Sequence, residues 1–337
     1  MAVSSIPTKF TNAAISNERS GSASCLTLTL RDYDLAATLT SGQAFRWRFH
    51  DGSWHGVVGR HWVALRSDEF SIVAETAEPV ANWEWLTDYL QTDLDLSVVL
   101  AAFPDDEPMR TAAQSCRGLR LLRQDPWECL ASFILSSTKQ IVQIQQIVAL
   151  LCERFGEPIP SGANSGPAFL FPTAERLARC AEAELRACKM GFRAPYLLAT
   201  ARTIADRTLD LARLEDLPVE IARVELMKLA GVGRKIADCV LLFAYGFPTA
   251  FPLDVWVMKA LRRLYFPKRR PGPKRLRHFS ETHFGPHAGY AQQYLFHYMR
   301  TKWKDLAPAR VKRGAAAAPT PSLPRSGGEG RGEEGRS

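Results

Sequence analysis

Residues 230–239 read AGVGRKIADC, and this short stretch separates two apolar, helix-like patterns. VEIARVELMKLA runs up to the first glycine and RKIADCVLLFAYG follows the last, so the sequence predicts two helices joined by a turn at Gly231 and Gly233. The second helix begins without Ser, Thr, Asp or Asn, which leaves its first N–H groups available to an outside acceptor such as a phosphate. A plain turn closed by a glycine explains the same pattern, and this alternative stays open.

Lys235 occupies the first turn of that second helix, beside Arg234. A cation in this position opposes the helix dipole, and the neighbouring positive charge adds repulsion. Together with partial desolvation, both effects favour the uncharged amine, which is the nucleophilic form of lysine. The alternative is an exposed lysine that contacts phosphate through its charge alone.

The composition of the whole chain narrows the class of protein. The length of 337 residues predicts about two domains, and the net charge of +8 favours an anionic partner such as nucleic acid. We expect a cytoplasmic protein with no membrane segment, because the sequence has no apolar stretch long enough and no signal peptide. The seven cysteines are scattered without a Cys-x-x-Cys pair. This spacing predicts reduced thiols and no metal site.

The pattern along the chain predicts an α+β fold. CLTLTL, AFRWRF, SWHGVVG, HWVALRS and FSIVAET, between residues 24 and 78, are typical of antiparallel strands, with a hairpin turn at Asp51-Gly52. We therefore predict a small antiparallel β domain over 24–100 and a larger all-α domain over 101–313. Residues 1–23 and 314–337 are expected to be disordered.

Within the helical part, one long helix is expected to begin at Pro126, after the N-cap Asp125, and to end before Gly156. The further predicted helices lie near 174–187, 193–207, 218–230, 234–246, 254–265 and 287–302.

The segment FPLDVWVMKALRRLY, residues 251–265, places Asp254 at the start of another helix. An N-cap aspartate is common by itself. The combination of the hairpin, Lys235, Pro252 and Asp254, however, resembles the signature of the helix-hairpin-helix DNA glycosylases, whose motif ends in a Gly/Pro-rich loop and an aspartate. The lysine variant implies a bifunctional enzyme. Endonuclease III-like relatives usually carry a four-cysteine cluster that this chain lacks, and alkylpurine glycosylases lack the lysine.

Three further stretches resemble one branch of that superfamily, the 8-oxoguanine DNA glycosylases. They are SGQAFRW at 41–47, RLLRQDPWECLASFILSS at 120–137 and GPHAGYAQQYLF at 285–296. With the hairpin, the resemblance spans about residues 24–302 in the expected order. It implies a DNA N-glycosylase with apurinic-site lyase activity that acts on duplex DNA containing oxidised guanine.

The resemblance also implies roles for the residues that bind the base. The Gly42 carbonyl would accept the N7–H that only oxidised guanine carries, and Gln292 would read the Watson–Crick edge. Phe296 and Cys239 would sandwich the ring, beside Pro252. Cys239 lies at i+4 from Lys235 and so on the same helix face. Without the resemblance, Cys239 and Phe296 would be interpreted as core residues.

Other positions would contact the DNA. Phe192 matches an aromatic wedge and Arg193 an arginine that contacts the orphaned cytosine; an exposed Phe-Arg pair is the alternative. Thr138, Gln143 and Trp256 depart from the residues common in the family at DNA-contacting positions. We therefore expect looser preference for the opposite base.

The run KALRRLYFPKRRPGPKRLR over 259–277 carries nine basic and no acidic residues. It is expected to lie near DNA and, at its Pro-Gly-Pro, to form a loop. A solvated surface is the alternative.

The resemblance implies that Lys235 attacks the deoxyribose to form a Schiff base, that Asp254 stabilises positive charge on the sugar, and that strand cleavage follows by β-elimination. It implies a monomer and neither a metal nor an organic cofactor. Two alternatives stay open: a glycosylase of the same superfamily for another damaged base, and a non-catalytic helix-hairpin-helix protein that only grips the DNA backbone.

Overall fold

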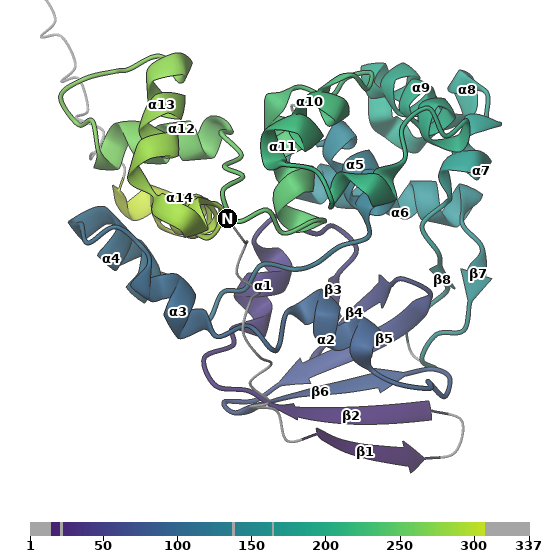
Figure 1. Ribbon diagram of the computed structural model, residues 1–337. Coiled ribbons are helices and arrows are strands. Elements are labelled where there is room, and N and C mark those ends of the chain that lie inside the picture. The colour runs from purple at the N-terminus through teal and green to yellow at the C-terminus, as the bar shows by residue number, and fades with distance from the viewer. Residues whose placement is uncertain (1–14, 21–22, 137–138, 164, 307–337) are drawn as a thin grey trace, which may run out of the picture.

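The computed structural model describes residues 15–20, 23–136, 139–163 and 165–306. The predicted tail at 314–337, and the predicted disorder of residues 1–14 and 21–22, lie outside the described residues. Figure 1 shows a sheet at one side of the molecule and most of the helices gathered on the other. This arrangement confirms the predicted α+β fold, with an antiparallel β region followed by a larger helical region.

The main sheet has six antiparallel strands in the order β1-β2-β6-β5-β4-β3. Their alternating sequences place one face inward: Leu26 and Leu28 of β2 are fully buried opposite Ala74 and Ile72 of β6. The strands are β1 (Ile15–Ser20), β2 (Ala23–Thr29), β3 (Arg48–His50), β4 (Ser53–Val58), β5 (His61–Ser67) and β6 (Ser71–Thr76), and a small second sheet pairs β7 (Pro158–Ile159) with β8 (Ala168–Phe169).

Two strand predictions need correction, and the hairpin prediction is confirmed. Residues 15–20 were expected to be disordered, but they form β1, because their backbone pairs with the open edge of β2. AFRWRF was expected to be a strand throughout, whereas pairing begins only at Arg48. Asp51 and Gly52 form the two-residue turn between β3 and β4, and both have positive φ, as such turns require.

Helices make up most of the remaining described chain. They are α1 (Leu35–Thr40), α2 (Glu84–Leu90), α3 (Leu96–Ala101), α4 (Glu107–Ser115), α5 (Pro126–Leu135), α6 (Ile141–Phe155), α7 (Ala174–Ala178), α8 (Glu182–Leu185), α9 (Ala194–Ala205), α10 (Val219–Met227), α11 (Arg234–Phe243), α12 (Val255–Leu264), α13 (Pro273–His283) and α14 (Ala288–Leu306), with the short turns η1 (Arg186–Met190), η2 (Gly191–Arg193), η3 (Leu211–Leu214) and η4 (Gly285–His287). No helix among the described residues is long and apolar enough to cross a membrane.

The long helix predicted from Pro126 is wrong, because it is two helices, α5 and α6. The Ser136 hydroxyl donates to the Phe133 carbonyl at 2.8 Å and so competes with the helical hydrogen bond there. A new helix then begins after Gln140, whose N–H donates to the Gln143 side chain at 3.0 Å. The break matters because it brings the end of α5 to the cavity described below.

Two other helical predictions also differ from the structure. The helix predicted over 174–187 is divided, because α8 starts anew at Ala181, whose N–H donates to Glu184 at 2.8 Å. In the basic run, the predicted loop occupies 265–272, but α13 follows it from Pro273 and was not predicted. Proline fits the first turn of a helix, where no N–H is needed.

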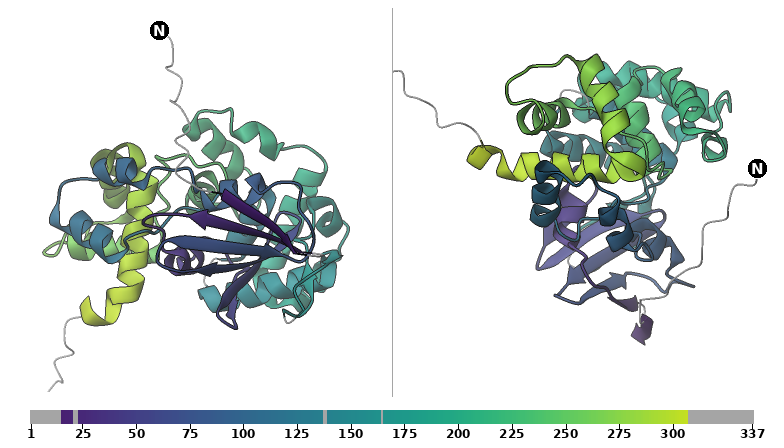
Figure 2. Two further views of the ribbon diagram at one scale, coloured as in Figure 1. Left: turned by 90° about the horizontal axis from the view of Figure 1, so that it is seen from below. Right: turned by 60° about the vertical axis from the view of Figure 1, so that its left-hand side comes forward.

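The buried apolar side chains of the described residues form two clusters. One lies between the sheet and helices α1 and α2, and the larger one fills the helical region. Leu96 and Val99 of α3 belong to the helical cluster although they precede the predicted boundary at residue 100. Figure 2 shows α14 as a long helix crossing the molecule, and it packs against α4 and α12. The domain boundaries themselves stay predictions.

A buried ion pair fixes the two helices of the hairpin. Arg223 of α10 donates to Asp238 of α11 at 2.5 Å, and the two side chains are only 5% and 6% exposed. Burial limits the hydration of both charges, so each depends on its ion-pair partners, which also include the more exposed Glu220 for Arg223 and Arg234 for Asp238. The pair therefore sets the angle at which α11, and with it Lys235, enters the molecule.

Asp238→Ala is expected to lower the free energy of unfolding by about 3 kcal/mol, because it leaves the buried Arg223 guanidinium with only the exposed Glu220 carboxylate as an ion-pair partner among the described residues. Glu225→Ala removes the more exposed pair between Glu225 and Lys228 on the same hairpin and is expected to cost less than about 1 kcal/mol. Urea denaturation of both variants checks this. Equal losses would contradict a special role for the buried pair.

Candidate active site

A cavity of about 390 Å³ lies where α5, α11 and α14 meet the segment that follows α1. Its walls include eight of the residues predicted from the sequence: Gly42, Lys235, Cys239, Pro252, Asp254, Trp256, Gln292 and Phe296. One of these residues, Gly42, lies early in the chain, and the other seven lie between positions 235 and 296. The structure therefore brings together the candidate catalytic and base-binding residues in one place.

The hairpin has the predicted form. Gly231 has φ +75°, and a Cβ there would come within 2.8 Å of the Tyr196 ring, so both its conformation and its neighbour require glycine. Gly233 is the N-cap residue of α11 and supplies no side-chain cap. The first N–H groups of α11 thus lack a side-chain acceptor, as the sequence predicted. Neither glycine lines the cavity, so their predicted DNA contacts belong to the outer surface.

Lys235 points its amine toward the end of α5. Its Nζ lies 3.2 Å from the Ser136 Oγ and 5.3 Å from the centre of the Phe133 ring. The Ser136 hydroxyl uses its own proton to bond the Phe133 carbonyl, so its oxygen accepts from the amine. Ser136 was quoted within a motif but given no role. The apolar pattern of the sequence continues past Ser136, so the sequence did not reveal that a helix ends there.

Asp254 caps α12 and faces the same cavity. Its Oδ1 accepts from the Val257 N–H at 2.7 Å. Burial raises the pKa of the Asp254 carboxyl above its ordinary value, while the cap hydrogen bond and the positive charge of Lys235 oppose that rise. A carboxylate and an amine that interact electrostatically across a partly dry cavity can stabilise a cation and transfer protons.

The base-binding candidates line the same cavity. Gly42 has φ +79°, and a Cβ there would lie 2.7 Å from Ile141 and 3.3 Å from the Phe296 ring. Gln292 is 3% exposed, and its Oε1 has no hydrogen-bond partner among the described residues. Gln293 donates to the Ser41 carbonyl at 3.0 Å and so fixes the residue before Gly42. An unpaired buried acceptor facing a cavity is suited to a ligand that donates.

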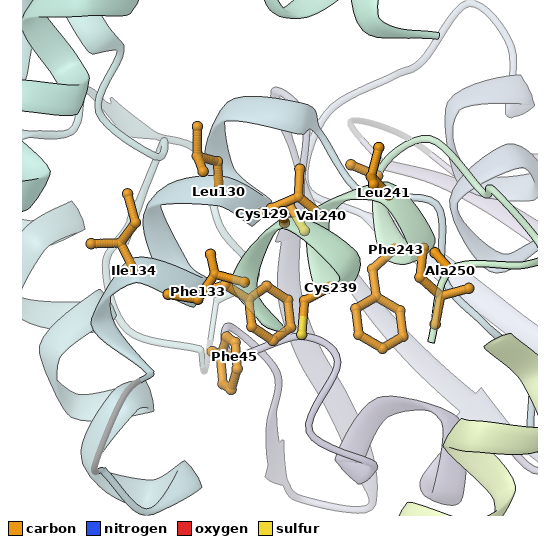
Figure 3. Close-up of a cluster of buried hydrophobic side chains, with 14 of the residues drawn as sticks. Phe45, Cys129, Leu130, Phe133, Ile134, Cys239, Val240, Leu241, Phe243 and Ala250 are labelled. Atoms are coloured by element: carbon orange, nitrogen blue, oxygen red, sulfur yellow. The ribbon is translucent and has the colours of Figure 1, made fainter. Parts of the chain in front are cut away.

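Cys239 lies on the cavity wall as a neutral thiol. Burial raises its pKa to about 12, so it does not supply a thiolate nucleophile at neutral pH. Figure 3 shows Cys239 beside Phe133 and Phe45, whose rings meet edge to face at 5.5 Å. The side chain therefore offers an apolar surface, which is what a contact with the face of a flat ring requires.

Among the remaining DNA-contact candidates, Phe192, Arg193 and Gln143 lie outside the cavity, whereas Trp256 lines it. Phe192 is 55% exposed, and the Arg193 guanidinium stacks 4.5 Å from its ring centre. Gln143 is exposed on α6, but its side-chain oxygen is used to accept the Gln140 N–H. Trp256 borders the cavity with the Lys259 ammonium 4.6 Å from its ring centre. Thr138 lies outside the described residues.

Eleven of the residues that line the cavity were given no role from the sequence, among them Phe45, Phe133, Ser136, Lys139 and Arg300. The two phenylalanines looked like ordinary core residues, and the two cations looked like ordinary surface residues of helices. In the described part of the chain, no group of three or more His, Cys, Asp or Glu side chains is placed to hold a metal ion.

Asp254→Asn is expected to raise the free energy of unfolding at pH 7, because asparagine keeps the helix cap and removes the buried charge. The folded-state pKa lies above the ordinary value of 3.8, so the stability of the wild type falls as pH rises through that window. Urea denaturation between pH 4 and pH 8 checks this, with Asp254→Ala as the variant that also loses the cap. An advantage of asparagine that stays constant with pH would contradict the charge explanation.

Known proteins support the motif-based resemblance. Residues 25–130 match the family model described as 8-oxoguanine DNA glycosylase, N-terminal domain, and residues 131–286 match the HhH-GPD superfamily of base excision DNA repair proteins. The chain is 30% identical over 289 residues to the N-glycosylase/DNA lyase OGG1 of Arabidopsis thaliana, covering 80% of this chain and 78% of the relative. It is 34% identical over 259 residues to the N-glycosylase/DNA lyase of Saccharomyces cerevisiae, covering 68% of each.

A solved structure agrees with these relatives. The Clostridium acetobutylicum 8-oxoguanine glycosylase/lyase, in complex with double-stranded DNA that has cytosine opposite 8-oxoguanine, is 29% identical with a TM-score of 0.79. The match covers 86% of this chain and 98% of that one. Both parts of the chain and their order thus agree with one family, and the chain belongs to the 8-oxoguanine DNA glycosylases.

Proposed function

We propose that this protein excises 8-oxoguanine from duplex DNA and then cleaves the strand at the resulting site, with the cavity as the base pocket and Lys235 as the nucleophile. The observation that carries this proposal is the shared cavity of the Lys235 amine, the Asp254 carboxylate and the unpaired Gln292 oxygen. Membership of the family and the names of the relatives, N-glycosylase/DNA lyase, support the same reaction.

Recognition of the base would rest on neutral hydrogen-bonding groups. The Gln292 oxygen accepts from the N1–H or the amino group on the Watson–Crick edge of guanine, which supplies the donor that this oxygen lacks. The Gly42 carbonyl accepts the N7–H of the oxidised base. Normal guanine has an acceptor at N7, so the same carbonyl would face another acceptor in a site without water. Phe296 and Cys239 cover the two faces of the ring.

The chemistry would begin with the uncharged amine of Lys235. Its nitrogen bonds to C1′ of the deoxyribose as the bond from C1′ to N9 breaks and the base leaves. Asp254 stabilises the positive charge that develops on the sugar, and the attached nitrogen loses a proton. The C1′–O4′ bond of the sugar ring then breaks, O4′ takes up a proton, and the nitrogen lone pair forms the C1′=N bond of the iminium, or Schiff base. Loss of a C2′ proton then expels the 3′ phosphate by β-elimination. Ser136 holds the amine in place through its hydroxyl oxygen.

Binding of duplex DNA would use the outer surface. The exposed Phe192 would insert into the base stack and help keep the duplex bent, with Arg193 toward the orphaned base. The uncapped start of α11 and the basic run at 259–277 would contact phosphates. A monomer, a cytoplasmic location near the nucleoid, and a reaction without a cofactor all stay predictions.

Borohydride trapping on a duplex with 8-oxoguanine opposite cytosine tests the proposal. We expect a covalent protein–DNA adduct with the wild type and none with Lys235→Gln, because reduction requires the imine. Lys228→Gln removes an exposed lysine of the same hairpin and should leave the adduct unchanged. Adduct formation only on another damaged base would replace the proposed substrate, and undiminished base release by Lys235→Gln would overturn the mechanism.

The opposite-base preference is expected to be loose. The Gln143 side-chain oxygen serves as a helix cap, and no arginine occupies this position. Excision of 8-oxoguanine opposite C, A, G and T should therefore proceed at single-turnover rates within about tenfold of one another, since one missing charged contact is worth about 1–3 kcal/mol. Gln143→Arg should increase the preference for cytosine. A sharp cytosine-only profile of the wild type would contradict this expectation.

A further inference from the structure

Arg300 is a cation on the cavity wall that neither the base pocket nor the covalent chemistry uses. Gln292, Phe296 and Arg300 lie four residues apart along α14, so their side chains follow one another on the same helix face. All three line the cavity. The Arg300 guanidinium carbon lies 5.4 Å from the centre of the Phe296 ring. The same helix therefore carries a polar group, an aromatic ring and a guanidinium in succession along the site.

A partly buried arginine that serves only the fold normally has a hydrogen-bond or ion-pair partner in the protein. Arg300 makes no hydrogen bond or ion pair with any described residue, and it is only partly exposed. Burial lowers the pKa of Arg300, and the nearby Asp254 carboxylate partly offsets this effect. Asp254 does not neutralise it by contact, because the carboxylate bonds the Val257 N–H and interacts with Lys235. The N–H donors of Arg300 therefore have no hydrogen-bonded acceptor among the described residues and are available to a ligand.

We propose that Arg300 binds a phosphate of the DNA backbone next to the flipped nucleotide and so positions the sugar in front of Lys235. This inference rests on the proposed function, because the substrate must enter the cavity. Both phosphates are bonded to the sugar whose C1′ meets the Lys235 amine, so the backbone has to pass beside the cavity wall. A guanidinium binds a phosphate through two parallel hydrogen bonds, which fixes orientation as well as position.

The stacking on Phe296 explains how the guanidinium is held before DNA arrives. A ring face attracts a cation and limits the rotation of the long arginine side chain. Phe296 also contacts Gly42, since a Cβ on that glycine would lie 3.3 Å from its ring. The phosphate contact and the base pocket are therefore joined through one side chain. Arg300 acts as a positioning residue in this arrangement and does not touch the reacting atoms.

The test measures binding to a duplex that contains the abasic analogue tetrahydrofuran, which has no base to contact. One flanking phosphate at a time, on the 5′ or the 3′ side, is replaced by an uncharged methylphosphonate. The full-length proteins compared are the wild type, Arg300→Gln, Arg300→Lys and Lys302→Gln. The last variant removes the same charge two residues further on, where the side chain is exposed.

Arg300→Gln should weaken binding of the all-phosphate duplex about tenfold, as expected for a charged hydrogen-bonded contact. One methylphosphonate should weaken the wild type to a similar extent and leave Arg300→Gln unchanged, since the contact is already lost. Arg300→Lys should recover part of the affinity, and Lys302→Gln should remain as sensitive to the methylphosphonate as the wild type.

The proposal would be overturned if a methylphosphonate at either position, 5′ or 3′, weakened binding by Arg300→Gln as much as it weakens binding by the wild type. It would also be overturned if Arg300→Gln bound the all-phosphate duplex with unchanged affinity. A loss that appears only on duplexes containing 8-oxoguanine would assign Arg300 to the base and also overturn it. Failure here is distinct from failure of the proposed function. Borohydride trapping of the wild type on the 8-oxoguanine duplex reports on Lys235 whether or not Arg300 contacts a phosphate.

Discussion

The electrostatic interaction between the Lys235 amine and the Asp254 carboxylate is the constraint on which the site depends. Each residue stands at the start of a helix, Lys235 in the first turn of α11 and Asp254 as the cap of α12. The dipole of α12 and its cap hydrogen bond favour the carboxylate form of Asp254 and oppose the burial that raises its pKa. Two helix N-termini thus converge on one cavity and place a lysine amine and a carboxyl group there together, which are the two groups that the proposed covalent attack on a sugar uses.

The rest of the fold holds this pair and completes the cavity around it. The buried ion pair between α10 and α11 fixes the hairpin, and the break after α5 brings the Ser136 hydroxyl to the lysine. The β region contributes through the segment after α1, where Gly42 approaches Phe296 of α14. The cavity is lined by residues from both parts of the chain, so it is complete only where the segment after α1 meets the helical region.

The sequence predicted the hairpin, the capped helix after Pro252 and the strands, because turn glycines, cap residues and alternation are local signals. It also placed Cys239 beside Lys235, since i+4 spacing is fixed by the helix. It could not predict the break at Ser136, because the apolar pattern continues through it and a hydroxyl-to-carbonyl bond decides the outcome. Arg300 could not be identified either, because its place in the cavity beside Asp254 depends on how α12 and α14 pack, which no local signal in the sequence gives.

The groups around the cavity divide by charge in a way that matches two separate tasks. The base-binding candidates Gly42, Cys239, Gln292 and Phe296 are all uncharged, whereas Lys235, Asp254 and Arg300 interact with one another electrostatically. A charge close to the base would bind normal and oxidised guanine almost equally, because the two differ by a neutral donor. Neutral acceptors in a pocket without water discriminate against normal guanine, because its N7 cannot donate the hydrogen bond that the oxidised base donates. In the proposed function the charged side chains contact only the sugar and a phosphate. They can therefore serve the reaction without reducing the selectivity of the pocket for the oxidised base.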